Sequence, residues 1–209
     1  MGDIPKDKTL FFDFDSTIAD TEPCHIRARD RVLEKYGIRI DDWSSYIGKS
    51  DSVIFSSLKE EFGLDMDVLR TVDAKMEISE AEALGTDVRP YPKVARLLSL
   101  PNMKFVLTYQ RYGFVRALLE RWGLLSRFGC IIALQDHTVT KAGEIVALGF
   151  DPKGCVLFDD IPRYLDEAVE AGMGAVLVKD GTPVWYDDAH SGQKYHKWDY
   201  CPLKKNGNP

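Results

Sequence analysis

The chain has 209 residues, with 33 acidic and 27 basic side chains and a formal net charge of −6. The hydrophobic fraction of 44% and the charged fraction of 29% are those of a globular protein, which excludes a disordered chain and a collagen-like fibre. The acidic balance argues against a nucleic-acid-binding protein, because phosphate backbones bind basic surfaces. This length allows one large domain, or a core domain with a small inserted domain.

Signals for membranes or export are not found in the sequence. No apolar run approaches the roughly 20 residues of a membrane-spanning helix, and residues 1–8 lack the apolar stretch of a secretory signal. Cys24, Cys130, Cys155 and Cys201 are widely spaced and form no CxxC pair, so neither a zinc site nor a disulfide framework is expected. We expect a cytoplasmic protein with reduced thiols and with no membrane or nucleic-acid partner.

Short apolar runs of strand length alternate with segments of helical spacing. The apolar runs are residues 10–14, 104–108, 130–134, 155–158 and 175–178. Continuous apolar runs are typical of parallel strands that are covered on both faces. The helical spacing is seen at residues 94–98, 115–122 and 165–169. This alternation predicts an α/β fold with a Rossmann-like, doubly wound parallel sheet.

The segment from residue 21 to residue 86 interrupts this alternation. It contains three helical patterns, each ending near a glycine, and no clear strand pattern. A helical block between the first two strands is typical of an inserted lid. We therefore predict an α-helical cap domain at residues 21–86, inserted into a core domain made of residues 1–20 and 87–209.

Two aspartates follow the first predicted strand at positions 13 and 15. In open α/β sheets, ligands bind outside the carboxyl ends of the strands. Side chains at i and i+2 point to the same face while a strand persists, so Asp13 and Asp15 would repel each other. A hard cation with oxygen ligands would offset this repulsion, and Mg²⁺ is the natural choice. The alternative is that both residues only cap the next turn.

A second acidic pair, Asp159 and Asp160, follows the strand predicted at residues 155–158. If this strand neighbours the first one, four carboxylates converge on one point, and such a cluster needs a metal ion. Taken alone, the pair is also compatible with the N-cap of a helix that begins at Pro162.

The chain resembles the haloacid dehalogenase-like superfamily of phosphotransferases. The elements that carry the resemblance are, in order, Asp13–Glu22 with His25, Leu107–Thr108, Lys141, and Asp159–Asp160. The helical block resembles the four-helix type of cap in this family. Residues 20–23, 46–50 and 89–92 are similar to the branch that contains phosphoglycolate phosphatases and β-phosphoglucomutases.

The resemblance implies a role for each matching residue. Asp13 would be the nucleophile that forms an aspartyl-phosphate, and Asp15 would act as general acid and then as general base. Thr108 would donate its hydroxyl to a phosphoryl oxygen, and Lys141 would balance the charge of phosphate and nucleophile. An acid at position 15 favours phosphate chemistry over carbon–halogen cleavage.

The resemblance also implies the metal and substrate contacts. Mg²⁺ would be held by the Asp13 carboxylate, the Asp15 backbone carbonyl and Asp160, with Asp159 as a direct or water-mediated ligand. The candidate substrate-binding residues are Thr17, His25 and Lys49, with Lys75 as a weaker candidate.

Several positions depart from the family pattern. Ser16 stands where this branch usually has glycine, and Tyr109 and Gln110 stand where a small residue or Asn is usual. Lys141 lies only 18 residues before Asp159 (159 − 141 = 18), a shorter interval than the family usually has. An exposed surface lysine is therefore the alternative interpretation of Lys141, and the same alternative applies to Lys49.

We expect a Mg²⁺-dependent phosphomonoester hydrolase that acts on a small phosphorylated metabolite. The alternatives are a phosphosugar mutase and a non-catalytic phosphate-binding protein. The C-terminal region is rich in aromatic side chains that either pack on the core or contact another subunit, so a monomer or a weak homodimer is expected. These side chains belong to Trp185, Tyr186, His196, Trp198 and Tyr200.

Overall fold

The structure is a computed structural model that describes residues 4–46, 48–134 and 138–186. His196, Trp198, Tyr200 and Cys201 lie outside the described residues. The other cysteines, Cys24, Cys130 and Cys155, are free thiols, as expected. No helix within the described ranges is long and apolar enough to cross a membrane.

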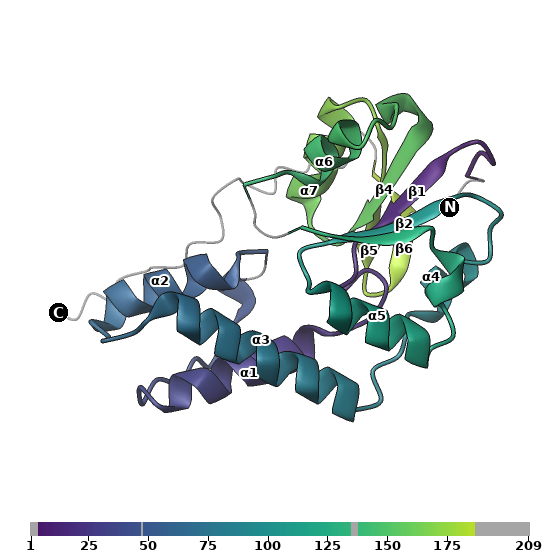
Figure 1. Cartoon of the computed structure of the whole chain (residues 1–209). Coiled ribbons are helices and arrows are strands. Elements are labelled where there is room, and N and C mark those ends of the chain that lie inside the picture. The colour runs from purple at the N-terminus through teal and green to yellow at the C-terminus, as the bar shows by residue number, and fades with distance from the viewer. Residues whose placement is uncertain (1–3, 47, 135–137, 187–209) are drawn as a thin grey trace.

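A six-stranded sheet forms the centre of the described part, in the order β3-β2-β1-β4-β5-β6 (Figure 1). The first five strands in sequence are parallel, and β6 pairs antiparallel with β5. The strands are β1 (Thr9–Phe12), β2 (Lys104–Thr108), β3 (Cys130–Ala133), β4 (Cys155–Asp159), β5 (Gly174–Lys179) and β6 (Thr182–Trp185). This architecture confirms the prediction of a Rossmann-like, mostly parallel α/β sheet.

Helices cover both faces of the sheet because successive strand residues point to opposite faces. Leu10 and Phe12 of β1 pack in one apolar cluster, and Phe11 packs in the other. The first cluster includes side chains of the helices α4 (Pro92–Leu97) and α5 (Tyr112–Arg121). The second includes side chains of α6 (Lys141–Ala147) and α7 (Pro162–Glu170). Short 3-10 helices lie at Leu125–Arg127 and Pro152–Gly154.

The register of the central strands places the two acidic motifs of the sequence next to each other. Phe12 of β1 pairs with Phe158 of β4, and the backbone N–H of Asp13 donates to the carbonyl of Phe158 at 2.9 Å. Asp13, which follows β1, and Asp159, the last residue of β4, are therefore neighbours at the carboxyl edge of the sheet.

Two details of the sheet differ from the prediction. Strand β1 ends at Phe12 rather than at residue 14. Strand β6 was not predicted, because Thr182–Trp185 is short and contains a proline rather than an apolar run. Trp185 packs against the first apolar cluster, and the buried Tyr186 donates its hydroxyl to Asp166 at 2.7 Å.

The inserted helices lie beside the sheet and have an apolar cluster of their own (Figure 1). They are α1 (Glu22–Glu34), α2 (Asp51–Phe62) and α3 (Val68–Gly85), with the 3-10 helix η1 (Ser44–Tyr46) between α1 and α2. The hydroxyl of Ser50 and the carboxylate of Asp67 cap α2 and α3, and Gly63 ends α2 with a φ of 61°. The fourth helical element expected from the resemblance is thus the three-residue η1 rather than an α-helix.

The chain leaves the sheet for the inserted helices near Ala19 and returns to it near Pro90, and these two connecting segments lie side by side. The backbone N–H of Tyr91 donates to the carbonyl of Ile18 at 2.9 Å, and Ala19 bridges Pro90. The guanidinium of Arg121 donates to four carbonyls at the end of α3 and in the segment that follows it, those of Ala83, Leu84, Thr86 and Val88. Hydrogen bonds from α5 therefore hold the returning segment in place.

Candidate active site

Three carboxylates gather at the carboxyl edge of the sheet. Oxygen atoms of Asp13, Asp159 and Asp160 all lie within 4.8 Å of one another. Asp13 is 7% exposed and Asp159 is fully buried, so water screens little of their mutual repulsion. The pairing of β1 with β4 produces this cluster, as the two acidic motifs of the sequence predicted.

Lys141 is the cation within this cluster. It is the first residue of α6, which the Thr140 hydroxyl caps by accepting from the Gly143 N–H. Its ammonium lies 2.6 Å from Asp13 Oδ1 and 2.6 Å from Asp159 Oδ2. Only 1% of Lys141 is exposed, so it is not a solvated surface lysine. The short interval before Asp159 still brings the lysine to the carboxylates.

Two tyrosine rings border the Lys141 ammonium. The ammonium lies 4.7 Å from the ring centre of Tyr164 and 5.5 Å from that of Tyr109. The Tyr109 hydroxyl donates to the carbonyl of Val139 at 2.8 Å, just before α6. The bulky residue at position 109 thus packs beside Lys141, which a small residue could not do.

The cluster carries more negative than positive charge when its groups are ionised. Burial raises the pKa of Asp13 to about 7, with Lys141 opposing the shift and Asp159 adding to it. Burial, together with the charges of Asp159 and Asp13, raises the pKa of Asp160 to about 9. Burial alone would lower the pKa of Lys141, but the two aspartates raise it above its ordinary value. A divalent cation would remove this imbalance.

The donor set fits Mg²⁺, which prefers hard oxygen ligands at about 2.1 Å. Asp159 has both oxygens engaged, because Oδ1 accepts from the Ile161 N–H at 2.9 Å and Oδ2 accepts from Lys141. Asp13 and Asp160 therefore offer the less committed oxygens of the three. This arrangement favours a water-mediated rather than a direct contact for Asp159.

Asp15 does not join the three-carboxylate cluster, which corrects the expectation that four carboxylates converge. Because β1 ends at Phe12, the i, i+2 rule no longer holds for Asp13 and Asp15. The Asp15 carboxylate instead accepts from the Thr21 hydroxyl and the Gln110 side-chain amide, and lies 3.5 Å from His25 Nε2. Burial alone would raise the pKa of Asp15, but His25, Thr21 and Gln110 hold it below its usual value.

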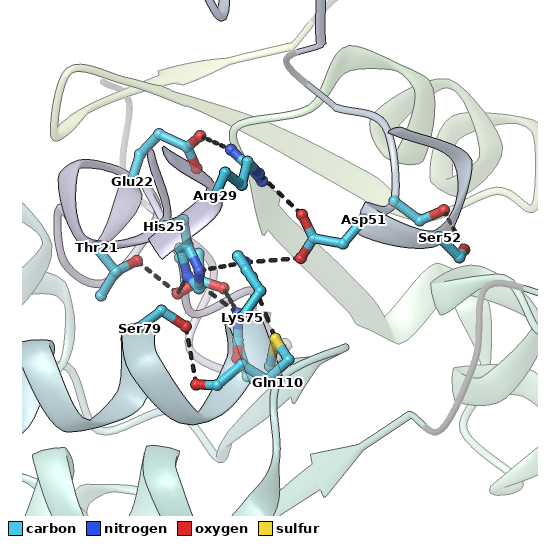
Figure 2. A network of polar contacts seen from close by, with 12 residues as sticks. Thr21, Glu22, His25, Arg29, Asp51, Ser52, Lys75, Ser79 and Gln110 are labelled. Atoms are coloured by element: carbon cyan, nitrogen blue, oxygen red, sulfur yellow. Dashed lines mark hydrogen bonds and ion pairs between the residues drawn. The ribbon is translucent and has the colours of Figure 1, made fainter. Parts of the chain in front are cut away.

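A chain of polar contacts connects His25 of α1 with side chains of the other inserted helices, α2 and α3 (Figure 2). The Lys75 ammonium lies 2.7 Å from His25 Nδ1 and 2.7 Å from Asp51 Oδ2. The guanidinium of Arg29 then joins Asp51 at 2.8 Å and Glu22 at 2.7 Å. We call Glu22, Arg29, Asp51 and Lys75 the cap network.

The cap network perturbs the groups at its centre. Burial alone would raise the pKa of Asp51, but Lys75 and Arg29 lower it to about 2. Burial lowers the pKa of Lys75, and Asp51 opposes that shift. Two acidic and two basic side chains balance each other here, so the network needs no additional ion.

The remaining predicted residues occupy different environments. Thr108 is 1% exposed at the end of β2, and its hydroxyl oxygen accepts from the Gln110 N–H at 3.2 Å. Thr17 is fully buried, and its hydroxyl has no hydrogen-bond partner among the described residues. Ser16 has a φ of 53°, which explains why glycine suits this position in related chains.

Lys49 is exposed, with its ammonium 5.2 Å from the ring centre of Tyr46. The neighbouring Gly48 has a φ of 76°, and a Cβ there would lie 3.4 Å from Cδ1 of Ile161. The Lys49 loop therefore touches the core one residue after Asp160. Among the described residues, the contact of Lys49 with the Tyr46 ring does not indicate which ligand Lys49 would bind.

Sequence reasoning did not find the contacts of Thr21, Gln110 and Asp51. Thr21 lies in a motif that the sequence singled out and Asp51 directly follows another, residues 46–50, but nothing in their spacing shows that they reach Asp15 or Lys75. Gln110 was identified only as a departure from the family pattern. A departure next to a predicted catalytic residue is the signal that could have identified it.

Comparisons with known proteins identify the family of the chain. Residues 10–178 match the model of the haloacid dehalogenase-like hydrolase family, so the chain belongs to that family. The fructose-1-phosphate phosphatase YqaB of Escherichia coli is 29% identical over 180 residues, which cover 81% of this chain and 95% of that protein. The family and this phosphatase support an enzyme of the phosphatase class.

Solved structures of low sequence identity share the fold. A predicted phosphoglycolate phosphatase from Haemophilus somnus superposes with a TM-score of 0.69 at 18% identity, covering 86% of this chain and 88% of the other. CbbY from Rhodobacter sphaeroides, in complex with phosphate, gives a TM-score of 0.67 at 18% identity, covering 80% and 84%. These likenesses support the fold of the chain.

Proposed function

We propose that the protein is a Mg²⁺-dependent phosphomonoester hydrolase that works through an aspartyl-phosphate on Asp13. The observation that carries the proposal is the buried cluster of Asp13, Asp159 and Asp160, which Lys141 neutralises only in part. The named phosphatase relative supports the same reaction class. The substrate is proposed to be a small phosphorylated metabolite in the cytoplasm.

The side chains divide the work of phosphoryl transfer. The Asp13 carboxylate attacks phosphorus and the ester oxygen leaves, with Asp15 supplying its proton. Water then attacks the aspartyl-phosphate, with Asp15 accepting the proton from that water. Thr108 donates its hydroxyl to a phosphoryl oxygen, while its oxygen accepts from the Gln110 N–H. Lys141 balances the charge of nucleophile and phosphate.

Asp13, Asp160 and the Asp15 backbone carbonyl are the proposed ligands of Mg²⁺, with Asp159 in contact through water. When bound, this ion reduces the repulsion between an anionic phosphate and an anionic nucleophile. Asp159 then has a second task, because its carboxylate also holds the Lys141 ammonium in place.

Residues 21–86 are proposed to act as a cap over this site. Their separate apolar cluster and the contact of the Gly48 loop with Ile161 support that assignment. Cap closure would exclude bulk water during the reaction. Thr17, His25 and Lys49 are proposed to contact the substrate, with Lys49 suited to a distal anionic group.

The test is the hydrolysis of p-nitrophenyl phosphate with and without Mg²⁺. We expect turnover that requires the ion and that disappears in Asp13→Asn, which keeps the shape of the side chain but removes its charge. The matched control is Asp73→Asn, which changes an exposed carboxylate on α3. Activity that survives Asp13→Asn would refute the assigned nucleophile.

A further inference from the structure

Gln110 stands at a junction between the proposed site and the inserted helices (Figure 2). It follows β2, and only 9% of the residue is exposed. Its backbone N–H donates to Thr108 Oγ1 at 3.2 Å, and its side-chain Nε2 donates to Asp15 Oδ2. The same nitrogen lies 3.2 Å from Nε2 of His25, a residue of α1. One residue thus touches two groups of the proposed reaction.

We propose that Gln110 is a positioning residue whose side-chain amide fixes the orientation of the Asp15 carboxylate. This inference rests on the function proposed above. It assigns a task to a residue at which the sequence departs from the family pattern.

The contacts of Asp15 show why the orientation depends on Gln110. Thr21 donates to Oδ1, and His25 Nε2 also faces Oδ1 at 3.5 Å. Among the residues that the structure describes, Gln110 is the side chain that donates to Oδ2. Donors on one oxygen leave a carboxylate free to rotate, whereas donors on both oxygens fix its plane. Removing the Gln110 amide would therefore loosen Asp15 without removing it.

The hydrogen positions on His25 agree with this assignment. A lysine ammonium only donates hydrogen bonds, so Nδ1 of His25 accepts from Lys75. The proton of the neutral ring is then on Nε2, which points to Asp15. With this tautomer the 3.2 Å contact between the Gln110 amide and His25 Nε2 joins two donors and is not a hydrogen bond, so the Asp15 carboxylate is the acceptor that both groups face.

The other end of the Gln110 amide is also informative. Its Oε1 is buried and has no hydrogen-bond partner among the described side chains and backbone. A buried acceptor without a partner is costly in a folded protein. The amide thus keeps its nitrogen on Asp15 although its oxygen lacks a partner in the described part of the chain.

The two half-reactions separate a positioning role from a purely structural one. The p-nitrophenolate anion leaves without needing a proton, so the first step with p-nitrophenyl phosphate tolerates a misplaced Asp15. The second step needs Asp15 to take a proton from water. A loosened Asp15 should therefore slow the hydrolysis of the aspartyl-phosphate much more than its formation.

The experiment is stopped-flow release of p-nitrophenolate by Gln110→Met and Gln110→Asn in saturating Mg²⁺, beside the wild type. For Gln110→Met we expect a burst close to one p-nitrophenolate per enzyme, followed by turnover reduced about 10- to 100-fold. Gln110→Asn keeps an amide on a shorter side chain and should recover part of the loss. Arg111→Met, a change at the neighbouring exposed residue, should keep the wild-type time course.

Several outcomes would overturn the proposal, and they differ from failure of the proposed function. Wild-type turnover that depends on Asp13 and Mg²⁺, combined with unchanged turnover in both Gln110 variants, would refute the role of Gln110 alone. Equal slowing of burst and steady state would show a structural role only. A wild type that hydrolyses no aryl phosphate would remove the proposed function and this inference with it.

Discussion

Two buried lysines invite comparison, because they have the same exposure and similar contacts but different charge surroundings. Lys141 and Lys75 are each 1% exposed. Lys141 lies between Asp13 and Asp159 with Asp160 close by, so negative charge remains in excess. Lys75 lies between Asp51 and the imidazole of His25, in a network whose charges balance.

The comparison indicates which of the two buried ionic clusters is suited to bind an ion from outside the protein. Burying ions is expensive, and a cluster that is balanced by protein groups can hold itself together. A cluster with an excess of buried carboxylates needs a cation from outside or must take up protons. We therefore interpret the Lys141 cluster as a reaction site and the cap network as a support for it.

The largest effect is expected from Lys141→Met. This change leaves three carboxylates without their ammonium, and it removes the charge that stabilises the transferring phosphate. We expect turnover of p-nitrophenyl phosphate to fall about 100- to 1,000-fold and the free energy of unfolding in the absence of metal to fall by about 3–5 kcal/mol. Turnover close to wild type would show that Lys141 serves stability alone.

Lys75→Met is the matched change on the cap side. Asp51 keeps Arg29 as a partner, so we expect a loss of about 3 kcal/mol in the free energy of unfolding, at the lower end for a broken buried pair. Denaturant unfolding measures it. Arg89→Met, at an ion pair whose arginine side chain is 72% exposed, is the control and should cost less than about 1 kcal/mol.

The comparison between the lysines would fail if Lys75→Met behaved like Lys141→Met. A loss of turnover of the same size would place Lys75 in the reaction machinery. Retained turnover at the lower stability would confirm that the cap network supports the site from outside.

Stabilisation by Mg²⁺ tests the excess of negative charge directly. At a concentration about 100-fold above its dissociation constant, an ion that binds only the folded state adds about 2.7 kcal/mol to the free energy of unfolding. We expect Asp160→Asn to lose most of this gain and Asp73→Asn to keep it. Equal stabilisation of both variants in thermal unfolding would contradict a metal site at Asp160.

Much of the core could be predicted from the sequence because apolar runs mark buried parallel strands. The strand predicted at residues 104–108 is the observed β2, and the other four predicted strands differ from the observed ones by one or two residues at one or both ends. Strand β6 gave no such signal, since an edge strand is only half covered. Its antiparallel pairing with β5 depends on tertiary contacts.

The site was predictable where it depends on strand order and not where it depends on side-chain direction. Asp13 and Asp159 become neighbours through the pairing of β1 with β4, which the alternating pattern implies. Asp15 points away from the three carboxylates because β1 ends at Phe12. No periodicity in the sequence fixes the residue at which a strand ends. Gln110 reaches Asp15 across 95 positions of sequence, which spacing within one motif cannot show.

The smallest effect concerns the pH dependence of the cap network. Lys75 and Arg29 hold the pKa of Asp51 at about 2, below its ordinary value of 3.8, although burial opposes them. Because the folded value is the lower one, this stabilisation is present above pH 3.8 and is lost as the pH falls through about 2. A shift of this size corresponds to about 2 kcal/mol.

The comparison with Asp51→Asn isolates that contribution from the other acidic groups. We expect the variant to be less stable than the wild type at neutral pH, and the difference between them to shrink by about 2 kcal/mol between pH 4 and pH 2. Urea unfolding at each pH measures the difference. A difference that stays constant across this range would mean that Asp51 is not held ionised by Lys75 and Arg29. In that case the cap network would no longer be a balanced set of charges, and its contrast with the Lys141 cluster would lose its basis.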